Sequence, residues 1–284
     1  MTFRLFLLLV LGAAAAAAAP LDDAIALYRA KKYPAARAAL EAIATAEPAN
    51  AAACYYLGMT LRHRGDATAL DDAVPWLQKA AELEPTNATY LSDFGGTSLQ
   101  LAAKNNSLTA ATRGRAAMEK ALELDPTDLD TRQGLFEFYE QAPWPLGSSA
   151  KAAEQLAEIR KHDPDRATAL SVRMRAEAKD YATAFKICDE LLAKNPADYT
   201  ALYQYGRTAS VSGLNLERGL ACLQKALTLS PPSPASPSAS NVWNRIGVIR
   251  EKLGRVPEAR AAYATALKLD VANRQAATAL DRLK

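Results

Sequence analysis

Residues that favour β-strands are scarce in this chain. Val and Ile together number 14 of 284 residues, whereas Ala, Leu, Glu, Lys, Arg and Gln recur in long runs. The second group loses little side-chain freedom in a helix and does not favour a pleated sheet. The scarcity argues against a sheet-based fold, and we expect an all-α chain.

Cysteine is also scarce, with only Cys54, Cys188 and Cys222. An odd number of widely spaced cysteines cannot form a fully paired disulfide framework, even in an oxidising compartment. We expect each to be a small buried hydrophobic residue. A bridge between Cys188 and Cys222 is the second interpretation, because the repeat register described below places them on neighbouring helices.

The chain lacks a block of charge of one sign. Its 34 basic and 31 acidic residues alternate along the sequence. Tracking a phosphate backbone requires clustered basic residues, so we expect no nucleic-acid partner.

The apolar run near the N-terminus is short for a membrane span. It extends from Leu5 to Ala19, which is 15 residues, against roughly 20 for a spanning helix. Arg4 precedes it, and small residues that offer A-x-A cleavage sites form its second half. We expect residues 1–19 to be a signal peptide and the protein to be periplasmic or secreted. An uncleaved membrane anchor is the alternative, whereas a lipid anchor is not indicated because no Cys follows the run.

Catalytic motifs are absent. His63 and His162 lie in different parts of the chain without metal-ligand spacing, and we interpret them as surface or turn residues. The sequence has no G-x-S-x-G, P-loop or dinucleotide fingerprint. We therefore expect no enzyme activity, no catalytic residue, no metal and no cofactor; an undetected enzyme is the rival hypothesis.

The strongest positive signal is a recurrent proline after a helical run. These prolines are Pro48, Pro85, Pro126, Pro164, Pro196 and Pro231, at intervals of 37, 41, 38, 32 and 35 residues. Proline cannot donate to the helical ladder and pushes the preceding residue out of the α region. We expect each proline to end a helix, and a regular stop indicates a repeated unit.

The repeat is clearest from Ser240 to Asn273, a stretch of 34 residues in which two amphipathic segments meet at Gly254. Small residues stand where two helices would approach closely, and large residues fill the space between them. Seven positions in the chain carry this pattern: Gly58, Gly95, Gly206, Trp243, Gly247, Ala259 and Tyr263. The pattern resembles the tetratricopeptide repeat, in which Trp, Leu-Gly, Tyr, Ala, Phe and Pro recur at these offsets.

This resemblance implies a solenoid of helical hairpins wound as a right-handed superhelix, with about seven repeats and a C-terminal capping helix. It places repeats 1 to 6 in residues 20–232, a Pro/Ser-rich linker in 233–239, repeat 7 in 240–273 and the cap in 274–284. The fourth and fifth repeats match the pattern weakly.

The resemblance also implies a binding surface, because in tetratricopeptide arrays the first helices line a concave groove. Carried onto this chain, the groove positions include Tyr55, Met59, Arg62, Gln133, Glu137, Arg175, Tyr203, Arg207 and Asn244. The set lacks the Lys at the fifth and the Asn at the ninth position that clamp a terminal carboxylate in some members. We expect Tyr203 and Arg207 to form one contact patch that does not hold the array together.

A peptide or protein of the cell envelope is the expected partner, bound without catalysis. The alternative is a carbohydrate- or cell-wall-binding module that stacks sugars on Trp144, Tyr55, Tyr199 and Tyr203. Trp144 lies in the loop APWPLGSS. It either folds over an irregular repeat or is an exposed anchor for a ligand.

We predict that the mature protein begins near Ala18 or Ala19 and is released in soluble form, because the apolar run is short and followed by small residues. N-terminal sequencing of secreted material tests this. An intact Met1 in a membrane fraction that requires detergent would identify the segment as an anchor.

Overall fold

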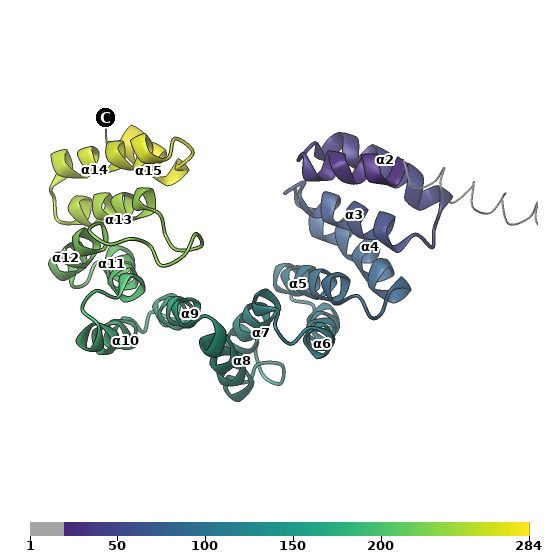
Figure 1. The fold of residues 1–284 in the computed structure, drawn as a ribbon, viewed down its shortest axis with the longest axis horizontal. Helices are drawn as coiled ribbons and strands as arrows, with labels where there is room; N and C mark the ends of the chain where they lie inside the picture. Colours follow the sequence, from purple (N-terminus) through teal and green to yellow (C-terminus); the bar gives the residue numbers. More distant parts are fainter. Residues whose placement is uncertain (1–19, 284) are drawn as a thin grey trace, which may run out of the picture. The chain divides into compact units, whose positions relative to one another are not determined.

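The computed structural model describes residues 20–283, and the predicted signal peptide lies outside these residues. The regular structure in this range is α-helical and contains no strand, which confirms the all-α prediction (Figure 1). Within the same range, no helix combines the length and the apolar character that crossing a membrane requires.

The helices follow one another with short connections. In chain order they are helical residues 20–29, α2 (Tyr33–Ala46), α3 (Ala51–Arg62), α4 (Ala69–Leu83), α5 (Ala88–Asn105), α6 (Leu108–Leu124), α7 (Leu129–Gln141), α8 (Ser149–His162), α9 (Pro164–Glu177), α10 (Tyr181–Lys194), α11 (Tyr199–Ser212), α12 (Leu216–Ala226), α13 (Ala239–Lys252), α14 (Val256–Leu269) and α15 (Arg274–Arg282).

These helices form two compact units, which meet within α8: an N-terminal unit up to Glu158 and a C-terminal unit from Ile159. In the N-terminal unit, α3 pairs with α4 and α5 with α6. In the C-terminal unit, the pairs are α9 with α10, α11 with α12 and α13 with α14, and α15 packs on α14. This is the succession of helical hairpins that the repeat pattern predicts.

Polar caps start the first helix of several repeats two residues after the proline. The side chains of Asn50, Asn87, Asp128 and Asp198 accept hydrogen bonds from backbone N–H groups in the first turn of α3, α5, α7 and α11. Such caps satisfy donors that a helix start leaves without partners. At these four prolines, the dipeptide that follows therefore sets where the next repeat begins.

The six prolines stand at three kinds of position, and Pro231 lies in the segment between α12, which ends at Ala226, and α13. Pro48, Pro85, Pro126 and Pro196 each follow the last residue of a helix by two positions, as predicted. The prediction is wrong for Pro164, which is the first residue of α9. A helix tolerates proline there because the first N–H has no partner within the helix.

Left-handed residues make the turn inside several hairpins. Gly65, Gly213 and Gly254 have φ between 69° and 78°, and Lys31 and Lys179 take φ values of 58° and 59° in the first and fifth repeats. Glycine adopts this conformation without strain, whereas lysine does not. The first and fifth repeats thus keep the left-handed turn without a glycine.

A glycine in the first helix meets a large side chain of the second helix in each well-matched repeat. A Cβ atom placed on the glycine would lie within 3 Å of that side chain. The pairs are Gly58 with Leu77 at 2.7 Å, Gly95 with Met118 at 2.4 Å, Gly206 with Leu223 at 2.2 Å and Gly247 with Tyr263 at 2.5 Å. At these four glycines the two helices of a hairpin approach closely.

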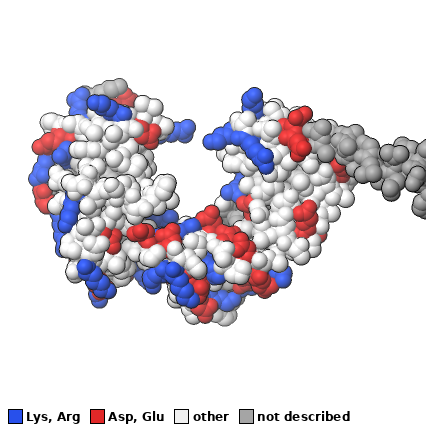
Figure 2. All heavy atoms as spheres, viewed as in Figure 1, with Lys and Arg blue, Asp and Glu red and all other residues white. Residues whose placement is uncertain are grey.

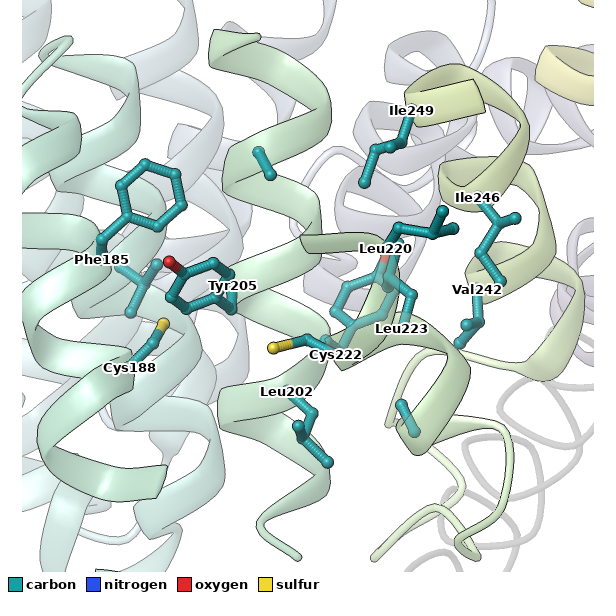
Figure 3. Close-up of a cluster of buried hydrophobic side chains, with 14 of the residues drawn as sticks. Phe185, Cys188, Leu202, Tyr205, Leu220, Cys222, Leu223, Val242, Ile246 and Ile249 are labelled. Carbon is teal, nitrogen blue, oxygen red and sulfur yellow. The ribbon is translucent and has the colours of Figure 1, made fainter. Parts of the chain in front are cut away.

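The core of the C-terminal unit is built around α11. Figure 3 shows the ring of Tyr205 between the thiols of Cys188 and Cys222. Both cysteines are free and buried, so the alternative of a bridge between them is not realised. Burial raises the pKa of Cys188 to about 12, with Asp189 adding to the effect, and the thiol therefore stays protonated at neutral pH.

The end of the chain closes on the seventh repeat. Ala276 and Ala279 of α15 pack against Ala259 and Tyr263 of α14. The hydroxyl of Tyr199 donates a hydrogen bond to the carbonyl of Pro237, which ties the end of the Pro/Ser segment to the sixth repeat.

We predict that Gly247→Leu lowers the free energy of unfolding by roughly 1 to 3 kcal/mol, because the added side chain collides with Tyr263. In limited proteolysis the C-terminal end should be cut first, since each repeat contacts mainly its neighbours. Thermal unfolding followed by circular dichroism gives the measurement.

Gly96→Leu is the matched control, because no atom lies within 4 Å of a Cβ placed on Gly96. This variant should unfold at or above the temperature of the parent. Equal melting of Gly247→Leu and the parent would show that the repeat register is wrong at the seventh repeat.

Candidate partner-binding surfaces

Tyr55 of the predicted groove is engaged within the N-terminal unit. Its hydroxyl donates a hydrogen bond to Asp93 Oδ2 at 2.7 Å, and its ring stacks on Tyr90 with centroids 4.4 Å apart. Burial raises the pKa of Tyr55, and the bond to the Asp93 carboxylate raises it further. The phenol stays protonated and links α3 to α5.

Arg62 and Met59 also face α5. The Nη1 atom of Arg62 lies 3.6 Å from Asp93 Oδ1 and donates to Thr97 Oγ1 at 3.4 Å. Met59 packs against the cluster that contains Phe94. Tyr55 and Arg62 thus hold two first helices together through Asp93 and Thr97, and Met59 adds apolar packing. The repeat pattern has no distinguishing signal for Asp93 or Thr97.

A largely apolar cavity of about 510 Å³ opens between α5, α6 and α7 in the N-terminal unit. Glu137 is the predicted groove residue that lines it. The other groove positions at the cavity were missed by sequence reasoning: Gly96, Leu99 and Gln100 of the third repeat and Gln141 of the fourth. The repeat register contained the signal, since these are ninth, twelfth and thirteenth positions.

Space for the cavity comes from Gly96, because no atom lies within 4 Å of a Cβ placed there. The side chains of Leu99, Ala103 and Phe138 form apolar walls of the cavity. Leu108, the first residue of α6, also lines it and is 64% exposed. Exposed apolar surface of this kind is stabilised when a partner covers it.

The loop after α7 closes one side of the cavity and is held by backbone hydrogen bonds. The Ser148 N–H donates to the Tyr139 carbonyl at 2.9 Å, and the Leu146 N–H donates to the Pro143 carbonyl at 2.9 Å. Pro143 and Leu146 line the cavity, whereas Trp144 is 90% exposed. Of the two interpretations of Trp144, the exposed position is the observed one.

The histidines occupy helix ends. His63 is exposed after α3, and its ring stacks on Tyr33 with centroids 4.6 Å apart. Burial lowers the pKa of His63, and Arg62 lowers it further. His162 is the last residue of α8. In residues 20–283 no group of three or more His, Cys, Asp or Glu is arranged to hold a metal ion.

Two of the four predicted groove residues of the C-terminal unit, Tyr203 and Asn244, are buried. Tyr203 is 7% exposed and Asn244 is 4% exposed, Arg207 is half-buried, and Arg175 is exposed. Tyr203 belongs to the hydrophobic core, so the expectation that it does not hold the array together is wrong. The cause is the packing of α11 against α9, α10, α12 and α13.

Charge is mixed on the surface as it was along the sequence. Figure 2 shows acidic and basic side chains interspersed on the visible face of each unit, separated by broad uncharged areas. On that face the surfaces available to a partner are therefore mainly uncharged.

The structure consists of repeated helical hairpins, in which a glycine of the first helix packs against a large side chain of the second. This architecture defines the class of helical-repeat proteins. A family model described as the tetratricopeptide repeat matches residues 21–88 and 211–279, one range in each unit. Both matched ranges are tetratricopeptide repeats, as the sequence pattern predicted.

Two solved structures show the same fold at low sequence identity. A tetratricopeptide repeat protein from Parabacteroides merdae is 17% identical, with a TM-score of 0.58 over 94% of this chain and 98% of that chain. Yeast Tom70 is 16% identical, with a TM-score of 0.55 over 88% of this chain and 49% of that chain. No curated protein matches the sequence.

We predict that two aromatic substitutions differ strongly in their effect on the free energy of unfolding. Tyr203→Ala should lower it by about 3 kcal/mol, because the ring is buried in the core. Trp144→Ala should change it by less than about 0.5 kcal/mol, because the exposed ring contributes little to packing. Urea unfolding followed by far-UV circular dichroism compares them, and equal effects would contradict the assigned burial.

Proposed function

We propose that this protein is a periplasmic or secreted scaffold that binds a peptide or protein of the cell envelope, without catalysis. The tetratricopeptide fold supports a role in protein–protein interaction. Support for the location comes from residues 1–19, whose basic residue, short apolar run and small residues follow the pattern of a signal peptide.

The cavity of the N-terminal unit carries the proposal. It lies at groove positions of the third and fourth repeats and has a volume of about 510 Å³, which is within the usual range of ligand pockets. Its walls are mainly apolar, with Glu137 and Gln141 at the α7 side. A partner segment that inserts bulky apolar side chains fits this combination, because buried anchors supply most of the energy of an interface.

Exposed apolar residues extend this surface beyond the cavity. Trp144 is 90% and Leu108 is 64% exposed, and Leu108 belongs to the lining. Tryptophan is enriched among residues that dominate binding energy. A partner segment that enters the cavity and contacts Trp144 would remove both side chains from water.

Carbohydrate binding is the second candidate, and the exposed ring of Trp144 is the observation that favours it. The tyrosines expected to assist are less suitable. Tyr199 and Tyr203 are 6% and 7% exposed, and Tyr55 already stacks on Tyr90. One exposed ring offers a small stacking surface, so we rank a protein partner first.

The test is capture from an envelope extract by the immobilised mature protein, with and without Gly96→Leu. This substitution places a leucine in the cavity without a collision, since the space around Gly96 is open. We predict that it weakens capture of a defined envelope protein at least tenfold, equivalent to about 1.4 kcal/mol. Quantitative mass spectrometry of the retained proteins gives the ratio.

Ala116→Leu is the matched control, because Ala116 is exposed on α6 and is absent from the cavity lining. It should capture as the parent does. A parallel arm offers purified cell-wall glycan. Retention of glycan that is lost in Trp144→Ala, together with protein capture unaffected by Gly96→Leu, would favour the carbohydrate function instead.

A further inference from the structure

The guanidinium of Arg207 on α11 contains a nitrogen that bonds to nothing in the part of the chain that the structure describes. Its Nη1 atom is buried and has no hydrogen-bond partner, although the side chain as a whole is only half-buried. Buried donors are nearly always hydrogen-bonded, and a buried charge without a partner is costly. This arrangement indicates that the guanidinium of Arg207 receives a hydrogen-bond acceptor from another molecule.

The charges around Arg207 are mainly positive. Burial lowers the pKa of Arg207, Arg245 on α13 lowers it further, and Arg173 on α9 has a smaller effect in the same direction. Tyr203 and Glu177 act in the opposite direction, but Glu177 also pairs with Arg173 at 3.7 Å. Arginine does not lose its proton in proteins, so an anion is what relieves this excess of positive charge.

Other polar atoms on the same turn of α11 are also without partners. The Oε1 atom of Gln204 and the Oγ1 atom of Thr208 are buried and have no hydrogen bond within residues 20–283. Each such atom in a native interior requires an explanation. α11 thus carries three buried polar atoms, including Arg207 Nη1, whose hydrogen bonds the packing of the array does not supply.

We propose that Arg207, supported by Arg245, binds the carboxylate of an aspartate or glutamate side chain of the partner. The planar fork of a guanidinium matches a carboxylate with two parallel hydrogen bonds. The charged groups here are Arg207, Arg245 and Arg173 on one side and Glu177 on the other. One additional carboxylate therefore lowers the local positive charge without reversing it. The inference rests on the proposed scaffold function and specifies the chemistry that the C-terminal unit recognises.

The test uses a tetraglutamate peptide with acetylated and amidated ends, titrated into the full mature chain. The side-chain Nε–H resonances of Arg207 and Arg245 are followed by NMR and assigned with Arg207→Met and Arg245→Met. Both resonances should shift and saturate with tetraglutamate. Tetraglutamine with the same ends should leave both unchanged.

Arg207→Met should weaken tetraglutamate binding at least tenfold while the melting temperature stays at or above that of the parent, because a buried nitrogen without a hydrogen-bond partner has been removed. Arg260→Met makes the same change of charge at an exposed position of α14 and should keep binding within twofold. If Arg207→Met does not fold, the Arg245 resonance of the parent, assigned with Arg245→Met, decides alone.

Four outcomes would overturn the inference: no shift of either resonance, equal shifts with tetraglutamine, a phosphoserine peptide bound tenfold more tightly, or binding only when the peptide ends in a free carboxylate. Gly96→Leu should bind tetraglutamate as the parent does. If neither arginine resonance shifts but the protein still captures its partner from the extract, the Arg207 site alone is refuted. If the resonances shift but Gly96→Leu does not weaken capture, the proposed cavity alone is refuted.

Discussion

Close approach of two helices is the constraint on which the rest of this structure depends. In four repeats a first-helix glycine lies against a large side chain of the second helix, and in each a methyl group on the glycine would come within 3 Å of that side chain. Protein interiors are close-packed, so a larger residue would force the helices apart. The hairpin spacing set by these glycines repeats along each unit and determines which faces of the first helices remain available.

Neighbouring first helices are joined by polar contacts as well as by apolar packing. Tyr55 bonds to Asp93 between α3 and α5, and Asn244 bonds to Gln275 between α13 and α15. A side chain used in this way is already occupied and contributes to the stability of the array. Some predicted groove positions in this protein therefore stabilise the array, and the proposed binding surfaces lie where the array does not use such positions.

Two such places differ in chemistry. In the N-terminal unit, Gly96 leaves an open space among apolar side chains, and its neighbours form a cavity. In the C-terminal unit, α11 is enclosed by four helices, and Arg207 is left with a buried nitrogen that has no partner. One surface suits an apolar anchor and the other an acidic side chain, which is the combination expected of a scaffold that distinguishes its partners by sequence.

The sequence alone determined the all-α class and the hairpin repeat, because helix propensity, proline stops and glycine spacing are local and recur. It did not determine the burial of Tyr203, the exposure of Trp144 or the cavity beside Gly96. Periodicity tells which residues share a helix face, but whether that face is covered depends on helices distant in the chain. Tertiary packing decided those features, since each results from contacts between repeats or with a loop.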